Sequence, residues 1–231
     1  MDRPDRGRRL AQGRDADIFE AGPGLVARRA RDGRSIRREA LIMQYVAAAG
    51  YPVPKVAGVS DDGSEILMER LEGPTMLDDL ARHPWRYRRH ADMLAELHRS
   101  LHVLPAPDWL PPAPGSVGDR LCHFDLHPLN VIMTRRGPVL VDWTNSCRGA
   151  GEADVALTWL LLACGGVPPV GRLAALAAGV RLRLAARFLS RFDPAPVNQE
   201  LEAVGAWKCA DRHTSEPERA AMRALVRANA A

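Results

Sequence analysis

Two neighbouring stretches decide the fold, His123-Phe-Asp-Leu-His-Pro-Leu-Asn130 and Val139-Leu-Val-Asp142-Trp143. Between them lie two short apolar runs on either side of a polar, glycine-containing segment, residues 134–138. Apolar runs around such a segment predict a β-hairpin that turns over these residues. In its symmetric register Asn130 and Asp142 face each other, with Cβ atoms about 5 Å apart.

Asn130 and Asp142 offer an amide oxygen and a carboxylate. These are the hard oxygen ligands that Mg²⁺ takes while the phosphates of a substrate complete its coordination. Asp125 lies just before Asn130, in a loop closed by Pro128, where it can stand beside the ion as a base. A base next to a magnesium site predicts phosphoryl transfer, in which the protein mainly positions groups and neutralises charge.

The stretches HFDLHPLN and VLVDW resemble the catalytic loop and the metal-binding strand of the aminoglycoside-phosphotransferase-like and choline-kinase-like small-molecule kinases, which share the protein-kinase fold. The resemblance implies that Asp125 accepts the proton of a substrate hydroxyl and that His123 buttresses this base. It implies that Asn130 and Asp142 bind Mg²⁺. It also implies ATP, or alternatively GTP, as phosphate donor, and a hydroxyl of an aminoglycoside, a related antibiotic or a metabolite as acceptor.

A different interpretation of the same loop is a zinc site. His123, Asp125 and His127 alternate in sequence, so on an extended strand all three would project from one face. This alternative leaves Asn130 and the facing Asp142 unexplained. For His127 alone, a hydrogen bond to the loop backbone is the expected role, with a direct catalytic role as the alternative.

The N-terminal residues 1–70 are expected to form a nucleotide-binding lobe, a small antiparallel β-sheet with one helix. The expected strands are residues 17–20, 24–29, 56–60 and 65–69, and the expected helix is residues 35–49. The segment Met68-Glu-Arg-Leu-Glu-Gly73 resembles the kinase hinge, and the resemblance implies that its backbone from Glu69 to Leu71 hydrogen-bonds adenine.

Kinases usually carry a lysine on the third strand of this lobe, paired with a glutamate of the helix. Here Glu39 matches the glutamate, but the strand offers Arg28. Lys55 and Lys208 are the only lysines, so 30 of the 32 cationic side chains are arginines. Arg28 is therefore interpreted as a working phosphate clamp; the alternative is a lost site in a catalytically weak, nucleotide-binding pseudokinase with a regulatory role.

Residues 71–231 are expected to form a mainly α-helical catalytic and substrate lobe, which completes a two-lobed α+β fold. The expected helices are residues 85–101, 172–189, 201–210 and 216–231, and a buried helix is expected at residues 155–164. Asp154 is expected to cap the helix that follows Asp142 and to hold the catalytic loop. His98 and His102 could chelate a metal, but with no third ligand nearby a packing role is expected.

Composition restricts the partners and the location of the protein. The net charge is +4, but the cations are spread among acidic residues, so no nucleic-acid partner is expected. The opening residues lack the apolar stretch of a secretory signal, and no apolar run is long enough to cross a bilayer. The four cysteines are scattered and should be reduced thiols. These features favour a cytoplasmic enzyme without membrane contact; they carry no signal for an oligomeric state.

Overall fold

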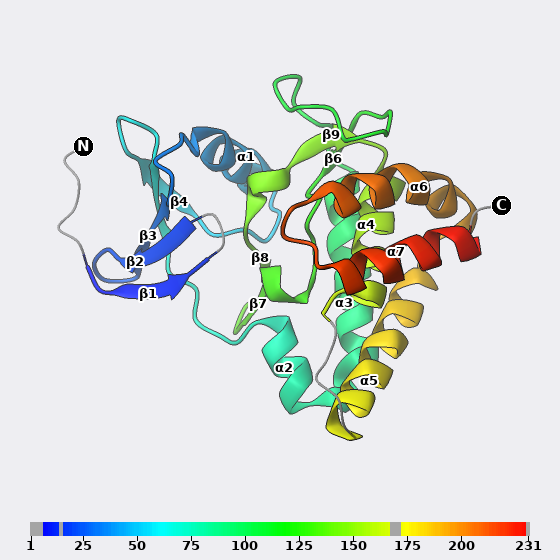
Figure 1. The fold of residues 1–231 in the computed structure, drawn as a ribbon. Helices are drawn as coiled ribbons and strands as arrows, with labels where there is room; N and C mark the ends of the chain where they lie inside the picture. Colours follow the sequence, from blue (N-terminus) through cyan, green and yellow to red (C-terminus); the bar gives the residue numbers. More distant parts are fainter. Residues whose placement is uncertain (1–6, 14–15, 167–171, 230–231) are drawn as a thin grey trace. The chain divides into compact units, whose positions relative to one another are not determined.

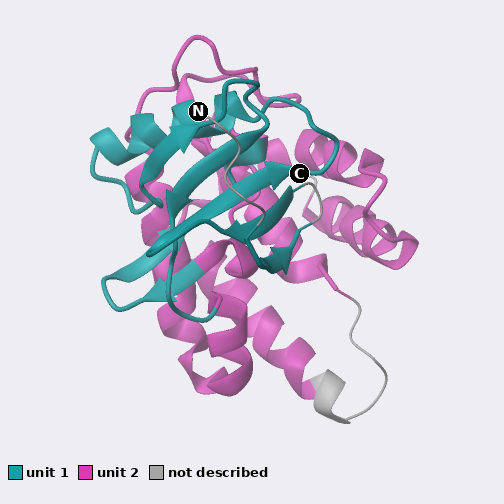
Figure 2. Ribbon diagram, turned by 90° about the vertical axis from the view of Figure 1, so that its left-hand side faces the viewer, with its two compact units in different colours: residues 1–74, 132–144 teal, residues 75–131, 145–231 magenta. Residues whose placement is uncertain are grey.

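The computed structural model describes residues 7–13, 16–166 and 172–229 (Figure 1). The chain divides into two compact units, which Figure 2 shows in different colours. Unit 1 comprises residues 1–74 and 132–144, and unit 2 comprises residues 75–131 and 145–231. The predicted lobe boundary after residue 70 remains a prediction.

Unit 1 is built on an antiparallel five-stranded sheet with the strand order β1-β2-β3-β5-β4. The elements are β1 (Arg9–Gln12), β2 (Ala16–Glu20), β3 (Leu25–Ala30), α1 (Arg37–Ala48), β4 (Val56–Val59) and β5 (Glu65–Glu69). The central strand β3 places Arg28 between Ile18 of β2 and Ile66 of β5. The sequence predicted the helix and every strand of this sheet except β1, and α1 begins two residues later than expected.

The hairpin that follows the catalytic loop consists of β7 (Val131–Thr134) and β8 (Gly137–Leu140). Its turn is only Arg135 and Arg136, so the prediction of a turn over residues 134–138 was wrong. The strands extend further because Gly137 adopts a positive φ of 115° and its carbonyl accepts a hydrogen bond from Thr134 Oγ1. Asn130 belongs to unit 2 and Asp142 to unit 1, so their pairing remains a prediction.

Unit 2 is mainly α-helical, as expected. Its helices are α2 (Met76–Arg82), α3 (Tyr87–His102), α4 (Gly151–Cys164), α5 (Arg172–Leu189), α6 (Pro194–Ala210) and α7 (Glu216–Asn229). The strands β6 (Arg120–Cys122) and β9 (Cys147–Gly149) pair beside them. The longest apolar run of the sequence forms α4, which contacts α3, α5, α6 and α7 and is buried on nearly every side (Figure 1).

The predicted helix bounds agree with those of unit 2 at most ends. The exceptions are α4, which begins at Gly151 rather than at residue 155, and α6, which begins at Pro194 rather than at residue 201. Asp193 caps it by accepting a hydrogen bond from the backbone N–H of Ala195, and proline is favoured in a first helical turn. Residues 230–231, the predicted end of the last helix, lie outside the described chain. Among the helices that the structure describes, none combines the length and apolarity needed to cross a membrane.

Candidate functional site

In unit 1, Arg28 lies at the centre of a polar group, the Arg28 cluster, which also contains Glu39, Asp142 and Thr144. Arg28 Nε lies 2.7 Å from Glu39 Oε1, and Arg28 Nη2 lies 2.8 Å from Asp142 Oδ1. The Thr144 hydroxyl lies 3.0 Å from Arg28 Nη2, 2.9 Å from Asp142 Oδ1 and 3.3 Å from Glu39 Oε2. The structure thus brings together the predicted clamp, its predicted helix partner and one predicted metal ligand.

Burial differs across the Arg28 cluster. The side chains of Arg28 and Glu39 are 10% and 4% exposed, whereas that of Asp142 is 41% exposed. Burial raises the pKa of the Glu39 carboxyl, and the adjacent Arg28 guanidinium opposes this rise. The cluster therefore has a buried ion pair, Arg28 with Glu39, and one carboxylate, that of Asp142, which solvent can reach.

The neighbouring Arg29 has a separate partner. In the β3–β5 ladder Arg29 is paired with Glu65, and its Nε donates to Glu65 Oε2 at 2.7 Å. Because successive side chains alternate across a strand, Arg28 and Arg29 project from opposite faces. Glu65 is buried, so Arg29 stabilises unit 1 independently of the Arg28 cluster.

The predicted hinge follows β5. The backbone N–H of Glu69 donates to the carbonyl of Lys55, and the side chain of Glu69 lies 2.8 Å from Arg136 Nη2. The N–H of Arg70 donates to the carbonyl of Gly24. The side chain of Glu69 therefore has a structural partner, and the binding of adenine by the backbone at Glu69 and Leu71 remains a prediction.

In unit 2, the catalytic loop holds Asp125 through two neighbours. Asn130 Nδ2 donates to the Asp125 carbonyl at 2.9 Å, and His127 Nε2 lies 3.4 Å from Asp125 Oδ1. Burial favours the neutral acid, but hydrogen bonding from His127 and nearby positive groups outweigh it and lower the pKa of Asp125 below its usual value. Asp125 is therefore an ionised carboxylate. The expected backbone bond of His127 is replaced here by a contact with the carboxylate.

The backbone of the catalytic loop is anchored by Asp154 in the first turn of α4. The N–H groups of His123 and Phe124 each donate to one carboxylate oxygen of Asp154, both at 2.9 Å. The predicted role in holding the loop is confirmed. The predicted cap is wrong, because α4 begins one turn earlier with Ala150 at the N-cap. His123, whose side chain is fully buried, contributes its backbone N–H to this anchor, and its role in buttressing Asp125 remains a prediction.

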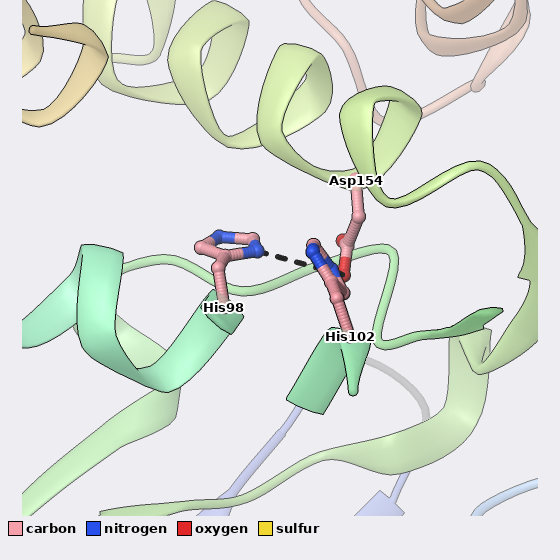
Figure 3. A group of neighbouring side chains, drawn as sticks. All are labelled: His98, His102 and Asp154. Atoms are coloured by element: carbon pink, nitrogen blue, oxygen red, sulfur yellow. Dashed lines mark hydrogen bonds and ion pairs between the residues drawn. The ribbon is translucent and has the colours of Figure 1, made fainter. Parts of the chain in front are cut away.

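Asp154 also contacts the two histidines of α3, as Figure 3 shows. His102 Nε2 lies 3.1 Å from Asp154 Oδ2, and His98 Nδ1 lies 3.6 Å from the same oxygen. The expectation that no third ligand lies near the two histidines was wrong, because α4 brings Asp154, which is 52 residues after His102 in the chain, into contact with them. Both carboxylate oxygens already accept backbone hydrogen bonds, so a hydrogen-bonded anchor accounts for the group.

The tautomer of His98 follows from its neighbours. The Thr158 hydroxyl donates to the Leu126 carbonyl at 2.7 Å, so at 3.0 Å it accepts a hydrogen bond from His98 Nε2. A neutral ring with its proton on Nε2 then turns a bare Nδ1 toward Asp154. Burial lowers the pKa of His98 to about 3, despite the nearby Asp154 carboxylate.

This buried neutral histidine predicts acid sensitivity. The folded pKa of His98, about 3, lies below its ordinary value of 6.5, so the unfolded chain takes up the proton first. The stabilising contribution is complete above pH 6.5 and is lost as the pH falls toward 3. The loss is up to about 1.4 kcal/mol per pH unit. In His98→Gln, which still donates to Thr158 but does not titrate, urea unfolding over this range should show a shallower decline. Parallel curves for the two proteins would contradict this assignment.

Backbone strain occurs next to the predicted base and at one predicted metal ligand. Within the described chain, the non-glycine residues with positive φ are Phe124, at 59°, and Asp142, at 65°. Phe124 immediately precedes Asp125, and its ring is held edge-on to Trp207 with centroids 4.9 Å apart. Such conformations cost about 1–3 kcal/mol and cluster at functional sites. The strain therefore singles out the predicted catalytic loop and metal-binding strand independently of their sequence pattern.

The sequence did not predict roles for Thr144 and Lys208. Thr144 contacts every member of the Arg28 cluster; its place two residues after Asp142 was the one available signal. Lys208 is buried on α6, pairs with Asp211 Oδ2 at 2.9 Å and lowers the pKa of Asp125 electrostatically. The signal in the sequence was its residue type, because Lys208 is one of only two lysines in an arginine-rich chain. Trp207 contacts Phe124, and Asp211 contacts Lys208.

Solved structures with the same fold include two kinds of small-molecule kinase. Aminoglycoside phosphotransferase APH(4)-Ia shares 14% identity over 96% of this chain and 92% of that chain, with a TM-score of 0.66. A choline/ethanolamine kinase family protein from Mesorhizobium loti shares 17% identity over 96% and 86%, with a TM-score of 0.58. The streptomycin–ATP complex of APH(2")-IIa shares 15% identity over 88% and 86%, with a TM-score of 0.59. These likenesses confirm the predicted two-lobed, protein-kinase-like α+β fold.

A comparison with curated proteins found no match. The sequence pattern of the phosphotransferase enzyme family, APH, matches residues 6–116 and 101–199. The match includes the Arg28 cluster, the catalytic loop and Asp154, and it extends over most of the chain. This protein therefore belongs to the phosphotransferase enzyme family.

Proposed function

We propose that the protein transfers the γ-phosphate of ATP, or alternatively GTP, to a hydroxyl group of a small molecule. The observation that carries the proposal is the position of the Asp125 side chain, between Asn130 and His127 in a loop whose backbone is anchored by Asp154. A fixed carboxylate with a lowered pKa can orient a hydroxyl and take its proton as the new bond to phosphorus forms.

The residues of the predicted magnesium site have the right donor chemistry. The Asn130 amide donates through Nδ2 to Asp125, which turns its oxygen away from that carbonyl and leaves it as a ligand. Asp142 offers a partly exposed carboxylate. In the proposed complex Asn130 and Asp142 hold Mg²⁺, which supplies positive charge to the phosphates. Arg28, oriented by Glu39 and Thr144, binds the phosphates, and the backbone at Glu69 and Leu71 binds adenine.

The ligands of the structural relatives support this assignment. One solved structure of a relative is a complex with ATP and streptomycin, and another is a complex with AMP-PNP and hygromycin B. A third is a complex with GDP and kanamycin. Nucleotides and hydroxylated small molecules are therefore the first ligands to test for binding and turnover.

Arg28 provides a specific test, because lysine usually occupies this position. Arg28→Lys restores the usual point charge and should hold or raise kcat and the affinity for Mg·ATP. Arg28→Ala should weaken nucleotide binding and turnover together. It should also lower the free energy of unfolding by about 3 kcal/mol, because the buried Glu39 loses its partner.

The matched control is Arg29→Lys, which keeps the ion pair with Glu65 on the other face of β3. Alanine is unsuitable there, since it would leave a buried carboxylate unpaired. Steady-state kinetics in ATP should leave the Arg29 variant near wild type. If Arg29→Lys lost activity and Arg28→Ala kept normal activity, the phosphate clamp would be Arg29 and the assignment of Arg28 would be wrong.

The proposal as a whole is tested by measuring ADP release with Mg·ATP over a panel of aminoglycosides, other antibiotics and hydroxylated metabolites. An acceptor-dependent rate that disappears on chelation of Mg²⁺ is the expected result. Nucleotide binding without transfer to any acceptor would instead favour the pseudokinase interpretation.

A further inference from the structure

A large cavity lies inside unit 2, next to the catalytic loop. Its volume is about 600 Å³, within the usual range for pockets that bind small molecules. Its walls come from α2, the catalytic loop, the end of α4, α5 and the start of α7. His127 is part of the wall, and its Nε2 lies 3.4 Å from Asp125 Oδ1. The cavity therefore adjoins the residue that contacts the proposed base.

The lining of this cavity is apolar. Leu80 and Leu184 form part of its buried wall. Leu77, Leu129 and Leu176 come from three separate elements, and they are 42%, 53% and 58% exposed. Exposed leucines that converge on one cavity are typical of a surface that an apolar ligand covers.

Charged groups contribute little to the lining. Among the described residues that line the cavity, Arg181 and Glu218 are the two with permanently charged side chains. Arg181 donates to the Gly165 carbonyl. Glu218 accepts hydrogen bonds from the backbone of Gly166 with one carboxylate oxygen and from Ser215 with the other. The lining therefore offers a polycationic ligand one carboxylate, that of Glu218, and both of its oxygens already accept hydrogen bonds.

We infer that this cavity binds the acceptor and that the acceptor is a neutral, largely apolar alcohol rather than a polycationic aminoglycoside. The inference rests on the proposed phosphotransfer and specifies its substrate class. Burying apolar surface provides the affinity, and the reacting hydroxyl lies at the end of the cavity that His127 lines, where the His127 ring contacts Asp125.

The chemical step balances without a further reactant. The alcohol oxygen forms a bond to the γ-phosphorus, while the bond from that phosphorus to the β,γ-bridging oxygen breaks. The proton of the alcohol passes to Asp125 and then to solvent. The products are a phosphate monoester of the alcohol and ADP.

Two leucines of α5 give a matched pair of variants for testing the cavity. Leu176 lines it and is 58% exposed; Leu182 does not line it and is 52% exposed. Leu176→Glu places a charge at the cavity, Leu182→Glu places the same charge elsewhere on the helix, and Leu176→Met keeps the site apolar. Because both leucines are exposed, neither glutamate should prevent folding.

The first measurement is binding of the neutral fluorescent dye N-phenylnaphthylamine without nucleotide. Leu176→Glu should weaken binding about tenfold or more, and the Leu182→Glu and Leu176→Met variants should bind like wild type. The isoprenoid alcohol farnesol should displace the dye, and kanamycin should not. Equal dye affinity in both glutamate variants, or displacement by kanamycin, would overturn the inference.

The second measurement is ADP release with Mg·ATP and either farnesol or kanamycin. Transfer of phosphate to farnesol would support both the substrate class and the phosphotransfer if Leu176→Glu weakens it and Leu182→Glu does not. Transfer to kanamycin but not to farnesol overturns the substrate class and leaves the proposed function intact. Absence of transfer to any acceptor, with nucleotide bound, overturns both.

Discussion

Asp125→Asn should bind Mg·ATP as tightly as wild type and lose phosphotransfer by about a thousandfold, a typical contribution of a general base. Asparagine preserves the shape of the side chain, and the backbone carbonyl that receives the Asn130 hydrogen bond is unchanged. It cannot take a proton from the acceptor hydroxyl. The prediction is checked by calorimetry for nucleotide affinity and by single-turnover kinetics for the chemical step.

The matched control is Asp119→Asn. Its side chain is 84% exposed, so it removes the same charge from unit 2 without touching the catalytic loop. This control should leave both affinity and turnover unchanged. If Asp125→Asn turned over within a few-fold of wild type, the assignment of Asp125 as the base would fail.

Asp142→Asn should weaken Mg²⁺-dependent nucleotide binding by about a hundredfold, on the order of 3 kcal/mol. The substitution removes a full charge from the proposed ion site. Asparagine also tolerates the left-handed conformation that residue 142 adopts, so the change isolates charge from backbone strain. Calorimetry with and without Mg²⁺ measures the effect.

The comparison variant is Asn130→Ala, which removes a neutral ligand and should weaken Mg·ATP binding less. Without Mg²⁺, Asp142→Asn should bind nucleotide about as well as wild type or better, because Arg28 is released from its ion pair with the carboxylate. Equal, small effects of the two substitutions would contradict a shared ion site.

The parts of the site that could be predicted from sequence are those set by short separations. Asp125 and Asn130 are five residues apart, so their contact follows from one loop. Arg28 and Glu39 lie on a strand and the following helix, and the family resemblance paired them before the structure did. Alternation along β3 likewise placed Arg29 on the face opposite Arg28.

What the sequence did not predict depends on tertiary packing. Asp154 reaches His98 and His102 only because α4 packs against α3. Spacing along the chain carries no information about that contact. The cavity is similarly invisible in the sequence, since Leu77, Leu129 and Leu176 each look like ordinary exposed or helical leucines until three elements bring them together.

The turn of the hairpin shows a local failure of a different kind. The sequence predicts that Thr134 and Gly137 belong to a longer polar turn. In the structure the Thr134 hydroxyl donates a hydrogen bond to the Gly137 carbonyl, and β7 and β8 extend to these two residues. Polarity indicated a turn correctly and overestimated its length. Side-chain hydrogen bonds to the backbone compete with such patterns.

The central claim is that Asp125 directs the γ-phosphate of ATP onto an acceptor hydroxyl. The most direct measurement is phosphorus NMR of wild type and Asp125→Asn, each with Mg·ATP and an acceptor identified by the ADP-release panel. We expect a phosphate monoester signal that grows in wild type as the γ-phosphate signal declines, and no such signal for the variant over the same time. Conversion of ATP only to ADP and inorganic phosphate, or monoester formed equally fast by both proteins, would contradict it.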